Sequence, residues 1–191
     1  DLATSTIDAY RDTLQWHIRT VLDRYHTVEC FEHPVGVGSV GLLTITVHME
    51  AREGEELYLQ VKEAVASVLE PYLGRSPYSN HGERVITGQR LMQAATDLFV
   101  GWTNWNGRDF YVRQLRDGKA SLDLERITAA QLIDFAQRCG SVLARAHART
   151  GDPQAIAAYL GAADTFEEGM TRFAQLYAKQ VERDYEEFCR S

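Results

Sequence analysis

Hydrophobic and polar residues alternate along two neighbouring stretches of this chain, residues 42–50 and 57–64. The hydrophobic positions are Leu43, Ile45, Val47 and Met49 in the first stretch and Leu57, Leu59 and Val61 in the second. A period of two with β-branched residues is typical of a half-buried strand. The polar run 51–56 between the stretches contains Gly54 and fits a turn. The pattern therefore predicts two consecutive strands.

Helical spacing of apolar residues predicts the other large elements. It indicates an amphipathic helix over 6–25, a helix over 83–100 and three helices after residue 128. A short strand over 27–33 and a hairpin around Asn106-Gly107 complete a sheet, because that dipeptide is preferred in two-residue hairpin turns. We expect an α+β chain with a small antiparallel sheet and one helix, followed by an all-helical part. The expected divisions are an N-terminal helix (1–26), the sheet (27–118) and the helical part (119–191).

Each of the three C-terminal helices carries a capping signal. The signals are a Thr128-x-x-Gln131 capping box, an Asp152-Pro153 start that Gly161 stops, and an Asp164-x-x-Glu167 box. These residues predict where the helices begin.

A glycine-rich segment precedes the first alternating stretch. Residues 34–41 place Gly36, Gly38 and Gly41 at G-x-G-x-x-G spacing, and backbone N–H groups in such a loop can cradle an anion. A dinucleotide-binding motif must open a helix, whereas a strand follows Gly41 here. The order of glycine loop, strand, turn and strand favours a protein-kinase-type phosphate loop. A sharp turn or a bulge is the structural alternative.

Lys62 lies on the second of the alternating strands. A kinase-type site has a lysine on such a strand, where it contacts the α- and β-phosphates. The structural alternative is a solvated lysine. The residues expected to bind nucleotide are Gly36, Val37, Gly38, Ser39, Gly41 and Lys62.

In a kinase-type site the lysine pairs with a glutamate on the next helix. Glu83 in the predicted helix 83–100 is the first candidate, so Lys62 and Glu83 are the expected catalytic pair. Glu63, Glu70 and Gln89 are the fallbacks, because the loop over 65–82 allows several helix registers. The structural alternative for Glu83 is a first-turn carboxylate that interacts favourably with the helix dipole.

Phosphoryl transfer also needs an aspartate near the acceptor and Asp or Asn ligands for magnesium. Gly151-Asp152 has the Gly-Asp of a kinase-like catalytic loop, but Ala157 stands where the asparagine is expected. Pro153 makes Asp152 a good plain N-cap. The sequence has no Asp-Phe-Gly, no G-x-S-x-G elbow and no pair of histidines enclosing a glutamate at zincin spacing. We therefore assign no metal ligand to this chain.

Composition narrows the possible partners. The formal net charge of −7 argues against a nucleic-acid binder, which needs a basic face. No apolar run approaches the ~20 residues that cross a bilayer, so no membrane partner is expected. The three cysteines form no pairing or zinc motif, which indicates reduced thiols and a cytoplasmic protein.

Six motifs taken together resemble a bacterial family known as domain of unknown function 2252. They are Val35-Gly36-Val37-Gly38-Ser39-Val40-Gly41, Leu59-Gln60-Val61-Lys62-Glu63-Ala64, Ser67-Val68-Leu69-Glu70-Pro71-Tyr72, Gly88-Gln89-Arg90-Leu91-Met92-Gln93-Ala94, Phe110-Tyr111-Val112-Arg113-Gln114-Leu115-Arg116-Asp117 and Leu143-Ala144-Arg145-Ala146-His147-Ala148-Arg149. The resemblance runs from about Tyr10 to Tyr185. It implies a kinase-like, circularly permuted fold, in which a Gly-Asp-x-His-x-x-Asn motif and an acidic strand motif precede the glycine loop.

Neither of those two motifs occurs in this sequence. The resemblance therefore implies that the chain is the C-terminal portion of a longer protein. We expect it to be a nucleotide-binding module of an ATP-dependent phosphotransferase-like protein, with ATP as cofactor and magnesium held by residues outside this chain. Its expected partners are the nucleotide and the upstream part of the same protein. The alternative is a non-catalytic kinase-like module for protein interaction or ligand sensing.

Overall fold

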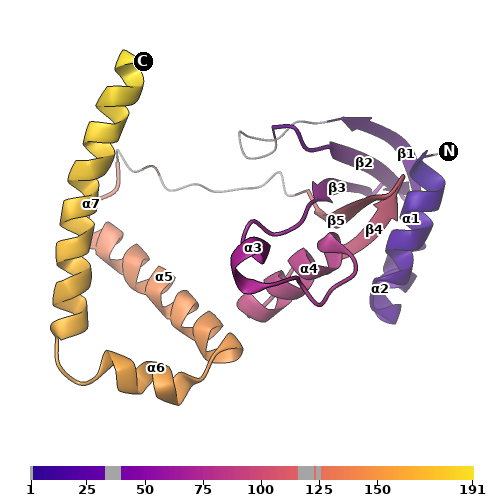
Figure 1. Cartoon of the computed structure of the whole chain (residues 1–191). Helices are drawn as coiled ribbons and strands as arrows, with labels where there is room; N and C mark the ends of the chain where they lie inside the picture. The colour runs from indigo at the N-terminus through magenta and orange to yellow at the C-terminus, as the bar shows by residue number, and fades with distance from the viewer. Residues whose placement is uncertain (1, 33–39, 116–122, 124–125) are drawn as a thin grey trace. The chain divides into compact units, whose positions relative to one another are not determined.

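A computed structural model describes residues 2–32, 40–115, 123 and 126–191 (Figure 1). The strands in these ranges are β1 (Tyr25–Glu32), β2 (Thr44–Ala51), β3 (Glu56–Ala64), β4 (Gly101–Trp105) and β5 (Arg108–Gln114). The helices are α1 (Leu2–Asp12), α2 (Trp16–Leu22), α3 (Glu70–Leu73), α4 (His81–Met92), α5 (Ala129–Thr150), α6 (Pro153–Leu160) and α7 (Thr165–Arg190). This confirms the α+β class with an all-helical C-terminal part. The chain divides into two compact units, Asp1–Ala146 and His147–Ser191.

The five strands form one antiparallel sheet in the order β1-β2-β3-β5-β4. The predicted strands 42–50 and 57–64 are β2 and β3, joined by a turn with Gly54 at φ +79°. The predicted hairpin is β4–β5, in which Asn106 and Gly107 both have positive φ, 50° and 73°. Two consecutive residues with positive φ are what a type I′ turn requires, and few residues other than Asn and Gly adopt them readily.

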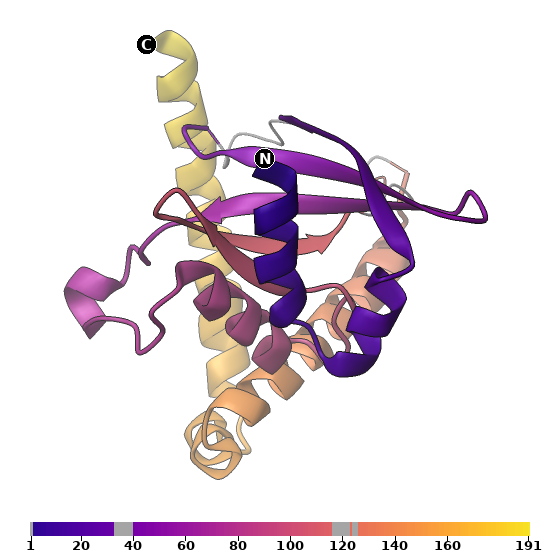
Figure 2. The same ribbon diagram turned by 90° about the vertical axis from the view of Figure 1, so that its right-hand side faces the viewer.

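Helices α1 and α2 cover one face of the sheet, which carries the hydrophobic core. Figure 2 shows α1 lying in front of the strands. The buried core residues are Tyr10, Leu14, Ile18 and Leu22 from the N-terminal segment and Val47, Met49, Leu57, Leu59, Val61, Phe110 and Val112 from the strands. The strand residues are the apolar half of the alternating pattern, so the predicted inward face is confirmed. Their removal from water is the main favourable term in folding this unit.

The expected single helix over 6–25 is instead two helices, with a break at residues 13–15. The hydroxyl of Thr13 donates a hydrogen bond to the carbonyl of Tyr10 (2.6 Å) and accepts one from the backbone N–H of Trp102 (3.1 Å). A side chain that bonds its own backbone competes with helix continuation. Thr13 therefore ends α1 while it supplies a hydrogen-bond partner to strand β4.

The expected helix over 83–100 is also wrong at its C-terminal end. Helix α4 stops at Met92, and residues 93–100 form an irregular connection to β4. The carboxylate of Asp97 accepts hydrogen bonds from the backbone N–H of Phe99 (2.9 Å) and of Gln114 (2.5 Å). Arg90 donates to the carbonyl of Val100 (2.9 Å). These contacts hold the connection against β5 and the end of α4, which a continuous helix would not permit.

Helix α4 packs on the opposite face of the sheet from α1. Asp109 alternates with the core residue Phe110, so its side chain points away from α1. Its carboxylate accepts hydrogen bonds from Asn80 Nδ2 (3.0 Å), the backbone N–H of His81 (2.8 Å) and Asn104 Nδ2 (2.9 Å). Asn80 also caps α4 by accepting from the N–H of Glu83 (3.0 Å). One half-buried cluster of polar groups thus fixes both the start of α4 and its place over β4 and β5.

The predicted starts of the three C-terminal helices are confirmed, and two of them have side-chain cap hydrogen bonds. Thr128 and Gln131 bond each other's backbone N–H groups at the start of α5, as a capping box does. Asp152 accepts from the N–H groups of Gln154 and Ala155 at the start of α6. Asp164 is the N-cap residue of α7, so the predicted start of this helix is confirmed, but its side chain makes no cap hydrogen bond.

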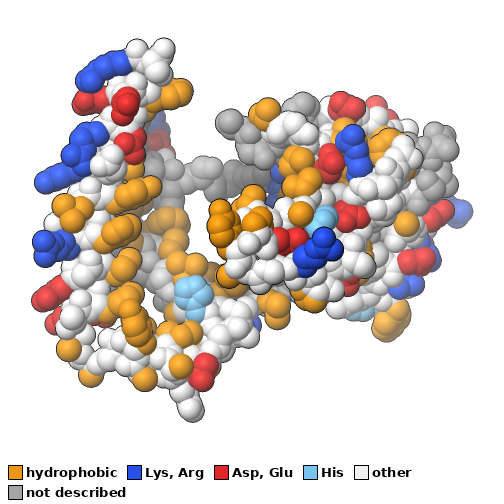
Figure 3. Space-filling view, in the orientation of Figure 1, with side chains coloured by type: hydrophobic (Ala, Val, Ile, Leu, Met, Phe, Trp, Pro, Cys, Tyr) orange, Lys and Arg blue, Asp and Glu red, His pale blue; other side chains and the backbone are white. Residues whose placement is uncertain are grey.

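Helix α7 carries a row of exposed apolar residues, visible in orange along its length in Figure 3. They are Phe166, Met170, Phe173, Tyr177, Val181, Tyr185 and Phe188, at the spacing of one helical face. Across the described ranges, no helix combines the length and the apolar character needed to span a membrane.

Glycine at position 82 allows α4 to approach the sheet. A Cβ on Gly82 would lie 2.1 Å from the backbone oxygen of Phe110, whereas one on Gly88 in the same helix would meet nothing within 4 Å. We expect Gly82→Ala to lower the free energy of unfolding by roughly 2–3 kcal/mol through overpacking. Gly88→Ala is the matched control and should raise it by about 0.5–1 kcal/mol. Urea denaturation measures both, and equal effects of the two variants would contradict this role of Gly82.

The titration of Tyr10 should lower the free energy of unfolding at high pH. Its hydroxyl donates to the carbonyl of Phe99 (2.6 Å), and burial, with the nearby Asp97 charge, raises the pKa of Tyr10 far above its usual range. Above pH ~10 the unfolded tyrosine loses its proton while the folded one keeps it. The stability present below that pH is therefore lost as pH rises, by about 1.4 kcal/mol per pH unit.

Tyr10→Phe removes this dependence. At pH 7 the free energy of unfolding of the variant should be about 1–2 kcal/mol lower than that of the wild type, because the carbonyl of Phe99 loses its donor. Denaturation of both proteins from pH 8 to 11 tests the linkage: the gap between them should narrow above pH 10. A constant gap would contradict it.

Candidate functional site

The structure describes two of the six predicted nucleotide-binding residues, Gly41 and Lys62. Gly36, Val37, Gly38 and Ser39 lie outside the described residues. Gly41 has φ +82° in the turn that leads into β2, a backbone conformation that favours glycine. Lys62 lies near the end of β3, the third strand of the sheet. The glycine segment thus falls between β1 and β2, and the lysine on the strand after them.

Lys62 belongs to a set of polar residues on the α4 side of the sheet. Their neighbours along the strands, Ile45, Val47, Val61 and Val112, pack with or against the core under α1, so alternation turns the set to the opposite face. We call this set the polar face: Thr44 and Thr46 of β2, Gln60 and Lys62 of β3, and Arg113 of β5. In the strand register, Thr44 is opposite Lys62, and Thr46 and Arg113 are both opposite Gln60.

Neither cation of the polar face is neutralised by a described carboxylate. Among the described residues, no ion pair is formed by Lys62 or by Arg113. Glu83 lies in the first turn of α4, where its N–H bonds to Asn80, and it makes no ion pair with Lys62. The pairing of Lys62 with Glu83 therefore stays a prediction.

None of the fallback partners forms an ion pair with Lys62 in the described ranges. Glu63 follows Lys62 and points to the other face, where it accepts from the N–H of Leu43 (2.9 Å) and contacts Arg108 (3.4 Å). The amide of Gln89 donates to Gln93 on the same helix (3.3 Å). Glu70 begins the short helix α3, and one of its carboxylate oxygens is buried with no hydrogen-bond partner in the described ranges.

Buried Gln60 and half-buried Arg113 form a hydrogen-bonded pair that the sequence did not reveal. The side-chain oxygen of Gln60 accepts from Arg113 Nε (3.1 Å) and Nη2 (2.8 Å), and Gln60 is 1 % exposed. Two bonds to one oxygen fix the plane of the guanidinium. The two residues are 53 positions apart, so only the pairing of β3 with β5 brings them together.

The two threonines of the polar face have buried hydroxyls without partners. Thr44 is 3 % exposed and Thr46 0 %, and neither Oγ1 has a hydrogen-bond partner among the described residues. A buried hydroxyl left unpaired costs about 1–3 kcal/mol, and natural proteins retain few such groups. Two of them beside an unpaired lysine are a feature that a ligand with hydrogen-bonding oxygens would explain.

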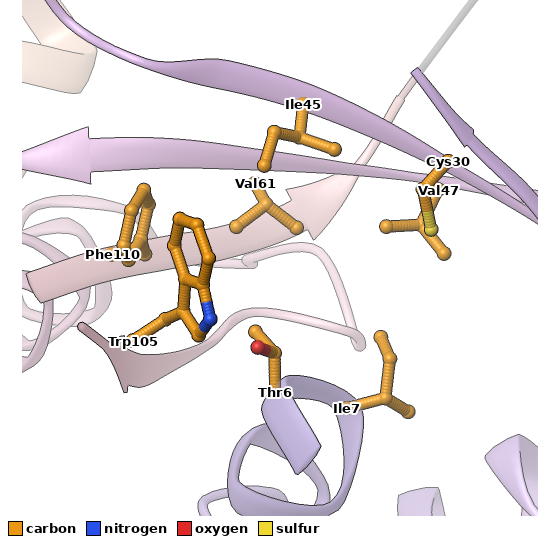
Figure 4. Close-up of a pocket in the computed structure, with 8 residues that line it drawn as sticks. All are labelled: Thr6, Ile7, Cys30, Ile45, Val47, Val61, Trp105 and Phe110. Carbon is orange, nitrogen blue, oxygen red and sulfur yellow. The ribbon is translucent and has the colours of Figure 1, made fainter. Parts of the chain in front are cut away.

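The cavity on the α1 side of the sheet is too small for a small-molecule ligand. Figure 4 shows its side chains, with Thr6 and Ile7 from α1 facing strand residues such as Ile45, Val61 and Trp105. Its volume of about 20 Å³ holds no more than a water, far below the several hundred Å³ of a small-molecule site. Burial, with the nearby Glu29, raises the pKa of the Cys30 thiol in its wall, which disfavours the thiolate form. This cavity is a packing gap of the core.

The carboxylates of the described residues do not gather into a metal centre. No group of three or more His, Cys, Asp or Glu side chains there is placed to hold an ion. Asp152, the candidate with the kinase-like Gly-Asp sequence, caps α6 with its side chain.

One comparison with known proteins gives a match. The model of a bacterial protein family, described as "Uncharacterized protein conserved in bacteria (DUF2252)", matches residues 1–191. No curated protein and no solved structure matches the chain.

Proposed function

This chain belongs to the bacterial family DUF2252, and we propose that it is the nucleotide-binding module of a kinase-like phosphotransferase. In this proposal ATP is the ligand, and the glycine segment with Lys62 holds its phosphates. An upstream part of the same protein supplies the catalytic aspartate and the magnesium ligands, in a circularly permuted order. We place the protein in the cytoplasm, which its free cysteines Cys30, Cys139 and Cys189 support.

The observation that carries the proposal is the position of Lys62. It lies on the third strand, on the face that α4 also occupies, and it makes no ion pair with a described residue. A kinase-type site has its lysine on this strand, with the glycine loop before the second strand and a helix after the third. An unpaired cation at that place is available to phosphate.

The residues around Lys62 fit a phosphate chain. Thr44, directly opposite in the register, contributes a hydroxyl without a described partner, and Arg113 adds a second cation on the next strand. When bound, ATP supplies the phosphoryl group to be transferred. Lys62 would hold the α- and β-phosphates, and the backbone N–H groups of Gly36, Gly38 and Gly41 would cover them.

A non-catalytic module is the second candidate. Asp152, the one residue of this chain with the sequence context of a kinase-like catalytic aspartate, accepts two backbone hydrogen bonds as the N-cap of α6. Both bonds go to Oδ1, so Asp152 already has a structural role as the cap of α6. If no upstream catalytic segment acts with this chain, the scaffold would bind nucleotide without transferring phosphate.

Mg-ATP should stabilise the full-length protein. A ligand present at 100 times its dissociation constant contributes about 2.7 kcal/mol to stability, a rise in Tm of roughly 5–10 °C for a unit of this size. Differential scanning fluorimetry measures the shift, which Lys62→Ala should abolish. Lys179→Ala in the exposed face of α7 removes an equal charge and should leave the shift unchanged.

Two results would overturn the proposal: no shift in the wild type, or an equal shift in wild type and Lys62→Ala. Consumption of ATP by the full-length protein then separates the two candidates. Turnover that Lys62→Ala removes supports the phosphotransferase, and binding without turnover supports the non-catalytic module.

A further inference from the structure

We propose that the polar face binds the ligand's phosphate chain along its length, from Lys62 to Arg113, with the hydroxyls of Thr44 and Thr46 as donors. The inference rests on the proposed function in placing phosphate at Lys62. It adds a second cation and two hydroxyls that lie outside the glycine segment. The shared chemistry is a chain of phosphates, whether it belongs to a nucleoside triphosphate or to inorganic tripolyphosphate.

The register of the strands gives the polar face its length. Lys62 is opposite Tyr111 on β5, so Arg113 lies at the diagonal position two residues further along. Diagonal neighbours on one face are about 7–8 Å apart, within reach of long side chains. The two cations can therefore contact successive phosphates of one ligand, and no described carboxylate pairs with either.

Carboxylates lie at both ends of this face: Glu29 and Glu56 lie past Thr46, and Asp109 lies at the other end, where Asn80, Asn104 and the N–H of His81 donate to it. His48 is 3.9 Å from a carboxylate oxygen of Glu29 and 3.4 Å from one of Glu56, and its ring stacks on Tyr58 at 4.5 Å. Phosphate would be repelled from Glu29 and Glu56. The charges thus favour an anion at Lys62 and Arg113 over one near His48.

Arg113 is oriented for such a ligand. Gln60 accepts from Nε and Nη2, and Nη1 makes no hydrogen bond to a described residue. A guanidinium fixed in plane with donors remaining suits phosphate oxygens better than a mobile side chain, because less entropy is lost on binding. Gln60, itself 1 % exposed, therefore acts as a positioning residue for Arg113.

The threonine hydroxyls are the observation that points to a ligand. Valine has the shape of threonine and fits a strand equally well, so packing alone does not call for a hydroxyl at position 46. Thr46 is fully buried, and its hydroxyl has no partner in the described residues. A phosphate oxygen would supply the acceptor, and a hydrogen bond to a charged group is stronger than one between neutral groups.

Thr46→Val gives a test in which stability and binding change in opposite directions. Removing an unpaired buried hydroxyl should raise the Tm of the unliganded protein by about 2–4 °C. The same change should weaken the binding of tripolyphosphate and of Mg-ATP about tenfold, because the bound phosphate loses a donor. Differential scanning fluorimetry gives the Tm and isothermal titration calorimetry gives the affinities, both on the full-length protein.

Thr103→Val is the matched control. Thr103 is 3 % exposed on the opposite face, and its hydroxyl donates to the carbonyl of Thr6 (3.1 Å). Because this hydroxyl is paired, its loss should lower the Tm and leave both affinities unchanged. Arg113→Lys provides a second variant. It keeps the charge but loses the guanidinium that Gln60 orients, so it should weaken the binding of both ligands.

The outcomes separate this inference from the proposed function. If Lys62→Ala abolishes Mg-ATP binding but Thr46→Val raises Tm without changing either affinity, the inference is wrong and the proposed function stands. If the wild type binds tripolyphosphate in a Thr46-dependent way but not Mg-ATP, the inference holds and the proposed function fails. Binding of neither ligand by the wild type overturns the inference.

Discussion

The alternation of apolar and polar residues in β2 and β3 is the constraint on which the rest of the sheet unit depends. Because successive side chains point to opposite faces, the observed register places Val47, Leu59 and Val61 together in the core. The same register turns Thr44, Gln60 and Lys62 to the other face. A slip of one residue would bury the lysine under α1 and expose the core, so the fold and the candidate site share one cause.

The two sides of the sheet are covered by different physical means. The α1 side is held by apolar burial around Tyr10, whose hydroxyl reaches the carbonyl of Phe99. The α4 side is held at its start by the hydrogen bonds of Asp109 and by the close approach at Gly82. These directional contacts fix α4 over β4 and β5, and its one large apolar buried residue is Ile86. The α4 side of the described sheet thus combines polar contacts with less apolar burial than the α1 side.

Much of the fold could be predicted from local signals. The Asn106-Gly107 turn and the Thr128-x-x-Gln131 capping box each depend on residues close together in sequence, and both are confirmed. The breaks in the two long predicted helices could not be predicted. They depend on Thr13 reaching Trp102 and on Asp97 reaching Gln114, contacts between elements whose positions the helical periodicity does not contain. Local propensity was overridden there by a tertiary hydrogen bond.

The candidate site divides in the same way. The position of Lys62 could be predicted from strand periodicity, since the alternation determines both the strand that carries Lys62 and the face to which it points. The Gln60–Arg113 pair depends on β5 pairing with β3 across 53 residues, and the unpaired hydroxyls of Thr44 and Thr46 depend on burial that a polar residue type does not suggest. The separation of Lys62 and Glu83 in sequence likewise does not determine the distance between their side chains.

Buried polar groups without partners are costly, and a sequence optimised only for stability would replace them. At position 46 valine would satisfy the strand and the packing at once, yet the chain keeps a hydroxyl there. The same holds for two cations, Lys62 and Arg113, that no described carboxylate neutralises. Each feature alone could be an accident of one position. Their coincidence on one face of adjacent strands is the arrangement from which we infer an anion-binding site, in which the ligand would supply the interactions that the described residues do not make.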